Sequence, residues 1–361
     1  MTSPALQPTI FYLHRLGDMV MLTALTQFLH RRYGAPCQII GTGSWTPQLY
    51  RGSPHVSAVW SFGRHRPFLL SLGWPSLVRA LHASNPGPIY VPEYHRPQLS
   101  RVKRMLFCSG VNPARCVFTD DVPGSTDERW VEALVRFGAC TPQALDLADY
   151  PPPSDIPACT PHLYVLDSEL RDCQDWVAAQ GWQGRQLILV QPVNHRTLGW
   201  RRGRRRFDDK AWPPERWVEL LHRLHARMPQ ALIVLRGAPG ELSVLAGIQA
   251  AADIEAVTSA GLTLRQTFAL CKLAHSMVSV DTGPAHAAAA LGLPLVILYG
   301  VAHQRVWLPR GAGGSPVIGL GGPPYSRRVD EISVDAVFEA WCRLTAQSAA
   351  LSAAAARPAS S

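Results

Sequence analysis

The stretch from Met277 to Gly300, MVSVDTGPAHAAAALGLPLVILYG, limits the possible folds more than any other part of the chain. Met277–Val280 is a short apolar run of β-forming residues that ends in a polar turn. The segment that follows, roughly Pro284 to Leu291, is nearly all alanine and opens with a residue suited to a helix start. Leu295–Tyr299 is fully apolar, as in a strand buried on both faces of a parallel sheet. The stretch therefore predicts a βαβ unit.

Four residues of this unit are candidates for a ligand site: Asp281, Thr282, Gly283 and His286. They gather at the carboxyl end of a strand and at the positive end of a helix, where open α/β sheets bind ligands and where anions are favoured. Thr282 and Gly283 alone are equally typical of an ordinary capped turn. The carboxylate and the imidazole beside them favour a site.

Composition restricts the class of protein. The 361 residues suffice for two domains, and 47% apolar with 17% charged residues indicates a globular chain. No apolar run approaches the roughly 20 residues that span a bilayer, and the N-terminus lacks the order of a signal peptide, so we expect a cytoplasmic protein. The eight cysteines suggest neither CxxC metal ligation nor a disulfide framework. A net charge of +9 favours acidic partners: phosphates, nucleic acid or an anionic membrane surface.

Strand and helix patterns alternate in both halves of the chain, beginning with a strand at Thr9–His14 and a helix through Tyr33. Proline crowds the middle, including Pro151-Pro152-Pro153, and hydrophobic periodicity disappears there. We predict the following segments: 1–145, an N-terminal Rossmann-like domain; 146–162, a Pro-rich linker; 163–332, a second Rossmann-like domain; 333–345, a C-terminal helix; and 346–361, a disordered Ala/Ser tail.

Asp18 follows the first predicted strand and opens the first helix. It has two interpretations. An acid in a first helical turn is favoured by the helix dipole alone. A carboxylate at this edge of the sheet also projects into a cleft between two such domains, opposite Asp281, where a general base would stand.

Two residues of the second half have similar double interpretations. Lys210 lies in the loop before a helix that starts near Pro214, so it is either a solvated charge or a point charge on a phosphate. Glu241 follows the turn Arg236-Gly237-Ala238-Pro239-Gly240, where acids are common in a first helical turn; it could also accept hydrogen bonds from a ribose.

Six arginines crowd into the segment before Lys210: Arg196, Arg201, Arg202, Arg204, Arg205 and Arg206. Nucleic-acid binding is not supported, because no recognition-helix pattern accompanies the cluster and Trp200 and Phe207 are its only aromatic neighbours. A solvated basic loop and a contact with a phosphorylated or membrane-bound substrate fit equally well.

Four motifs together resemble glycosyltransferase family 9, the ADP-heptose:lipopolysaccharide heptosyltransferases: DTGPAHAAAALGLP with VILYG, DDKAWPPERW, RGAPGE, and LGDMVMLTALTQFL. The resemblance implies the GT-B type of α/β fold, in which two Rossmann-like doubly wound domains face a cleft. It also implies transfer of a heptose or related sugar from an ADP-sugar to a lipopolysaccharide core or similar anionic glycan acceptor.

The resemblance further implies a role for each candidate residue. Asp18 matches the catalytic base, Lys210 the lysine that meets the donor diphosphate, and Glu241 the ribose contact. Asp281 matches the donor-sugar contact, while Thr282, Gly283 and His286 match the diphosphate-binding turn and helix start. Arg15, Arg201 and Arg202 are candidate acceptor contacts. Only Leu16 separates Arg15 from Gly17, where the family usually has several small residues, so Glu93 is the next candidate base if Asp18 is only a cap.

The expected reaction is a single inverting displacement in which Asp18 takes the proton of an acceptor hydroxyl. We expect no cofactor and no metal, because no carboxylate cluster lies near the donor motifs, and contact with the cytoplasmic face of the inner membrane is compatible with the basic charge. Two alternatives stay open: a sugar-nucleotide enzyme of another class, such as an epimerase, which needs no acceptor pocket, and a non-catalytic binder of anionic polymers.

Overall fold

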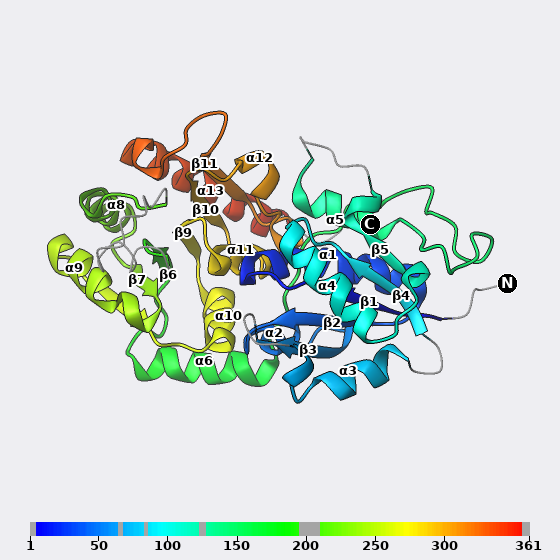
Figure 1. Ribbon diagram of the computed structural model, residues 1–361. Helices are drawn as coiled ribbons and strands as arrows, with labels where there is room; N and C mark the ends of the chain where they lie inside the picture. Colours follow the sequence, from blue (N-terminus) through cyan, green and yellow to red (C-terminus); the bar gives the residue numbers. More distant parts are fainter. Residues whose placement is uncertain (1–4, 64–67, 83–85, 123–127, 195–209, 356–361) are drawn as a thin grey trace, which may run out of the picture. The chain divides into compact units, whose positions relative to one another are not determined.

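The computed structural model describes residues 5–63, 68–82, 86–122, 128–194 and 210–355 (Figure 1). The chain divides into two compact units, Met1–Tyr164 and Val165–Ser361, which we call the N-terminal and the C-terminal unit.

Strands and helices alternate along the described part of the N-terminal unit (Figure 1). Its elements are β1 (Gln7–Phe11), α1 (Leu16–Tyr33), β2 (Cys37–Thr42), α2 (Thr46–Tyr50), β3 (Val56–Phe62), the 3-10 turn η1 (Phe68–Leu70), α3 (Trp74–Leu81), β4 (Pro86–Val91), α4 (Arg96–Cys108), η2 (Pro113–Arg115), β5 (Cys116–Phe118), η3 (Thr119–Asp121) and α5 (Trp130–Gly138).

The five described strands form one parallel sheet in the order β3-β2-β1-β4-β5. Helices α3 and α4 cover one face, where Leu77 and Val102 pack with Phe11 and Ile89 in a common core. Helices α1 and α5 pack against each other, and their approach is so close that a side chain at Gly138 would collide with Leu25. The strand order reverses between β1 and β4. The carboxyl ends of these two strands are therefore where a ligand is expected to bind.

The C-terminal unit repeats the alternation over its described residues. Its elements are α6 (Asp167–Ala179), β6 (Leu187–Gln191), α8 (Pro214–Arg227), β7 (Leu232–Gly237), η4 (Pro239–Glu241), α9 (Leu242–Ala252), β8 (Ala256–Ala260), α10 (Leu264–Leu273), β9 (Ser276–Val280), α11 (Gly283–Ala290), β10 (Leu295–Tyr299), α12 (Gln304–Trp307), η5 (Ala312–Gly314), β11 (Val317–Gly321), η6 (Val329–Glu331) and α13 (Val334–Ala355).

Its six described strands are parallel and follow the order β11-β10-β9-β6-β7-β8. Strands β9 and β10 are buried along their whole length, as the apolar runs of the sequence predicted. Trp217 of α8 and Trp341 of α13 fill the core on one face of the sheet, together with Val278 and Leu298. The order reverses between β6 and β9, which is the switch point of a doubly wound sheet.

The predicted linker, 146–162, lies within the N-terminal unit. The chain from 139 to 166 contains neither helix nor strand, yet it is tied to α1. The Thr23 hydroxyl accepts a hydrogen bond from the His162 amide at 3.0 Å, and the Gln27 amide donates to the Thr160 carbonyl at 2.9 Å. This segment is therefore a packed part of its unit.

The predicted end of the last helix is wrong. Helix α13 continues from Val334 to Ala355, ten residues past the predicted end at 345, so most of the predicted disordered tail is helical. The physical reason is composition: the segment is rich in alanine, which has the highest helix propensity of all residues.

Candidate active-site residues in the two units

The candidate donor residues of the C-terminal unit lie at the β6–β9 switch point. Asp281 directly follows β9, and Thr282 is the N-cap of α11, where its side chain accepts a hydrogen bond from the Ala285 amide at 3.4 Å. Gly283 and Pro284 open the helix. Thr282 therefore caps the turn, as one of its two interpretations predicted. The positive end of α11 lies beside the carboxylate of Asp281.

Asp281 is the centre of a buried ionic cluster. The Lys210 ammonium donates to its Oδ2 at 2.5 Å and to its backbone carbonyl at 3.0 Å, and His286 Nε2 lies 3.2 Å from its Oδ1. Burial alone would raise the pKa of Asp281, but the hydrogen bond from His286 and the charge of Lys210 hold it well below its usual range. Lys210 is thus a partly buried member of the cluster and not a solvated surface charge, with one-fifth of its side chain exposed.

The second ring nitrogen of His286 has no hydrogen-bond partner among the described residues, although it is buried. Since buried polar atoms are normally satisfied, this nitrogen marks a place where a ligand or a water molecule would bond. The Lys210 ammonium, the backbone N–H groups at the start of α11 and the second ring nitrogen of His286 are thus available for hydrogen bonds to the oxygens of one ligand.

Glu241 follows β7, the other neighbour of β6, at the same carboxyl edge of the sheet. Its side chain is buried, and its Oε2 accepts a hydrogen bond from the Ala238 amide at 2.7 Å. Burial raises the pKa of Glu241. A side chain at Gly237 would come within 2.9 Å of this carboxylate, so the glycine leaves it room. The structure thus gives Glu241 a local capping role, and its ribose contact stays a prediction.

In the N-terminal unit, Asp18 lies in the first turn of α1 beside the β1–β4 switch point. It does not act as the N-cap, which is Arg15. Its carboxylate Oδ2 is 3.1 Å from Nδ1 of His14, and Nε2 of the same ring is 3.1 Å from Oε1 of Glu93, the residue that follows β4 by two positions. His14 was missed by the sequence analysis, whereas Glu93 was considered only as a substitute for Asp18.

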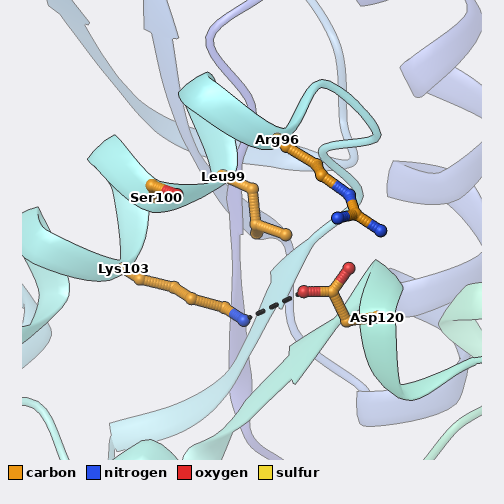
Figure 2. A pocket seen from close by; sticks show the side chains of 5 residues that line it. All are labelled: Arg96, Leu99, Ser100, Lys103 and Asp120. Carbon is orange, nitrogen blue, oxygen red and sulfur yellow. Dashed lines mark hydrogen bonds and ion pairs between the residues drawn. The ribbon is translucent and has the colours of Figure 1, made fainter.

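A pocket of about 450 Å³ opens at the N-terminal end of α4 and is lined by Arg96, Leu99, Ser100, Lys103 and Asp120. Figure 2 shows the Arg96 and Lys103 side chains extending from α4 towards Asp120, with Leu99 between them. Lys103 and Asp120 form an ion pair at 3.2 Å. The hydroxyl of Thr119 donates to the backbone carbonyl of Glu93, so the pocket adjoins the end of β4.

The remaining predicted residues are placed only in part. Arg15 is exposed at the start of α1. Arg201 and Arg202 lie outside the described residues, as does the whole arginine cluster. Within the described ranges, no three His, Cys, Asp or Glu side chains come together in a way that could hold a metal ion, and no helix is both long and apolar enough to cross a bilayer.

The family model described as glycosyltransferase family 9 (heptosyltransferase) matches residues 127–333, more than half of the chain. The chain belongs to glycosyltransferase family 9. The enzyme is therefore a glycosyltransferase, and the two alternatives left open by the sequence are set aside. The match contains Lys210, Glu241 and the Asp281–His286 segment but not Asp18. No curated protein matches the chain.

Solved structures of this family have a similar fold. A family 9 glycosyltransferase from Veillonella parvula has a TM-score of 0.73 at 14% identity, over 96% of this chain and 99% of that one. Escherichia coli ADP-heptose lipopolysaccharide heptosyltransferase II has a TM-score of 0.68 at 20% identity, over 95% and 99%. Escherichia coli heptosyltransferase WaaC with ADP has a TM-score of 0.64 at 16% identity, over 94% and 100%. The predicted α/β fold of GT-B type, with two Rossmann-like domains, is confirmed.

Proposed function

We propose that this family 9 enzyme transfers a heptose or a related sugar from an ADP-sugar to an anionic glycan acceptor such as a lipopolysaccharide core, with inversion and without a metal ion. The observation that carries the proposal is the Lys210–Asp281–His286 cluster at the positive end of α11, inside the segment that matches the family. Escherichia coli heptosyltransferase WaaC was solved with ADP and with ADP-2-deoxy-2-fluoro heptose, which supports the choice of donor.

In this mechanism the C-terminal unit binds the donor. Departure of the nucleoside diphosphate leaves negative charge on its phosphate oxygens, and that charge must be stabilised as the sugar–oxygen bond breaks. Lys210 supplies a positive charge and the first turn of α11 supplies backbone N–H groups. Asp281, held ionised by its two partners, would accept hydrogen bonds from hydroxyls of the sugar.

The N-terminal unit supplies the base and the acceptor site. Asp18 would remove the proton of the acceptor hydroxyl while the oxygen attacks the anomeric carbon. The pocket lined by Arg96 and Lys103 begins three residues from Glu93, and its cations suit a phosphate or carboxylate of the acceptor.

The test is Asp18→Asn, which keeps the shape of the side chain and an acceptor for His14 but removes the base. We expect turnover to fall about 10²- to 10⁴-fold, with ADP affinity and melting temperature nearly unchanged. Asp146→Asn is the matched control, since the Asp146 side chain accepts a hydrogen bond from the Ala148 amide in an exposed turn of the same unit, and an Asn oxygen can accept the same bond. A variant that melts several degrees lower but still turns over would show that Asp18 serves only the start of α1.

A further inference from the structure

Glu93 is a fully buried carboxylate, with 0% of its side chain exposed. Burying such a charge is costly unless a partner compensates it. Its Oε1 accepts from the His95 amide at 2.9 Å and faces His14 at 3.1 Å, while its Oε2 has no hydrogen-bond partner within the described part of the chain. His14 is therefore the side chain that balances this charge.

The ring of His14 contacts a carboxylate through each of its nitrogens. A neutral imidazole can donate only one hydrogen bond, so donation to both Asp18 and Glu93 requires the imidazolium. The ring stacks on Tyr12, with ring centroids 4.7 Å apart and an angle of 14° between the planes. The Tyr94 ring centroid is also 4.7 Å from that of His14, and the two planes are tilted by 40°. The orientation of the ring is thus fixed by its neighbours as well as by its hydrogen bonds.

We propose that His14 and Glu93 are positioning residues for Asp18: Glu93 fixes the imidazolium, and the imidazolium fixes the carboxylate that takes the acceptor proton. The proposal rests on the role of Asp18 proposed above. It explains why two carboxylates share one cation. When the acceptor O–H bond breaks and the proton forms a new O–H bond on Asp18, the attraction between Asp18 and His14 weakens. Glu93 keeps its charge at that moment and holds the ring in place.

The pH dependence follows from the same contacts. Burial alone would lower the pKa of His14, but the hydrogen bonds to Asp18 and Glu93 raise it to about 9. Among the described residues, the other titratable groups near the ring are Tyr12, Tyr94 and the neighbouring Arg15; burial raises the pKa of both phenols, so they stay neutral at pH 9. Activity should therefore decline above about pH 9, as His14 loses its proton.

The stability of the fold should follow the same titration. Because the pKa of His14 in the folded protein lies above its unfolded value, the stabilisation from His14 is complete below about pH 6.5 and is lost as pH rises through about 9.

The decisive variant is Glu93→Gln, which preserves size and an acceptor oxygen but removes the charge. We expect kcat to fall about 10- to 100-fold, because the base is held less firmly. The ADP dissociation constant and the acceptor KM should stay within about twofold. The decline of kcat at high pH should begin at least one pH unit lower than in the wild type.

His14→Asn should abolish the decline of kcat near pH 9. Glu128→Gln is the control, since Glu128 pairs with Arg136 and leaves His14 untouched; it should match the wild type.

Titration of the His14 ring by NMR separates this inference from the proposed function, because it needs no substrate. A wild-type ring that titrates near pH 9, and at a lower pH in Glu93→Gln, supports the network even if no sugar transfer is found. A wild-type ring that titrates near the ordinary value of about 6.5 overturns it. An unchanged kcat profile in Glu93→Gln would also overturn it, whatever happens to stability.

Discussion

The Lys210 ammonium donates hydrogen bonds to both the carboxylate and the backbone carbonyl of Asp281. These two bonds place its charge at the start of α11. We expect Lys210→Ala to weaken ADP binding by about 1.5–3 kcal/mol, or roughly 10- to 150-fold in Kd. Lys210→Arg should restore only part of the affinity, since a planar guanidinium does not replace a compact ammonium. Isothermal titration calorimetry measures both.

Lys272→Ala is the matched control for this measurement. Lys272 belongs to the same unit and donates to the Leu291 carbonyl at 3.1 Å, just past the other end of α11. If net charge alone governed ADP binding, both lysine variants would lose the same affinity. Unchanged ADP affinity in Lys210→Ala would rule out the assigned contact with the diphosphate.

The proximity of two candidate residues could be predicted from the sequence where both lie in one compact motif. Asp281 and His286 are five positions apart, and a strand followed by a helix start fixes where both belong. His14 and Glu93 are 79 positions apart and meet only because β1 and β4 are neighbours in the sheet. A histidine at the end of a strand carries no signal of its own, so the pair needed the strand order.

At the scale of elements, α11 shows why the family motif contains so many alanines. The side chains of Ala285 and Ala287–Ala290 are all fully buried, so a methyl group is all that fits along this helix. The alanine run was correctly interpreted from the sequence as a helix, and its small side chains allow it to pack closely against β9 and β10. The position of the helix start, and thus of the N–H groups at the proposed donor site, depends on this fit.

Ala288→Leu tests that dependence. Three extra carbons have no space at a residue with 0% exposure, so we expect the free energy of unfolding to fall by about 1–3 kcal/mol in urea denaturation. ADP affinity should fall as well, because α11 must shift. Ala251→Leu is the control on the exposed side of α9 and should change neither quantity. A destabilised Ala288→Leu enzyme with full ADP affinity would separate the packing of α11 from its role in binding.

At the scale of the whole molecule, the net charge of +9 predicts acidic partners but does not say where they bind. Two basic regions compete: the α4 pocket, and the arginine cluster that the structure does not describe. The test uses two double variants: one carries Arg96→Gln and Lys103→Gln, and the other carries Arg201→Gln and Arg202→Gln. The acceptor KM of each is measured at several salt concentrations. Neutralising the pair that contacts an anionic acceptor should raise the acceptor KM and make it less dependent on salt.

Each result of that comparison is informative. A rise in acceptor KM with unchanged ADP affinity assigns the altered region to the acceptor. Loss of ADP affinity in the Arg201/Arg202 variant would assign the cluster to the nucleotide instead. If neither pair changes acceptor KM, the anionic character of the acceptor is wrong.

The strand order of the two sheets has a consequence for how such an enzyme can diversify. In the N-terminal unit the candidate polar groups stand on the segments after β1 and β4, and in the C-terminal unit on the segments after β6, β7 and β9. The two core clusters described above each consist of residues of one unit. Under the proposed assignment of donor and acceptor, mutations that retune sugar or nucleotide preference can therefore accumulate after β6, β7 and β9 while acceptor choice is inherited unchanged, and the reverse holds after β1 and β4. On that assignment, one scaffold can give rise to enzymes that join different sugars to different glycans by altering one unit at a time.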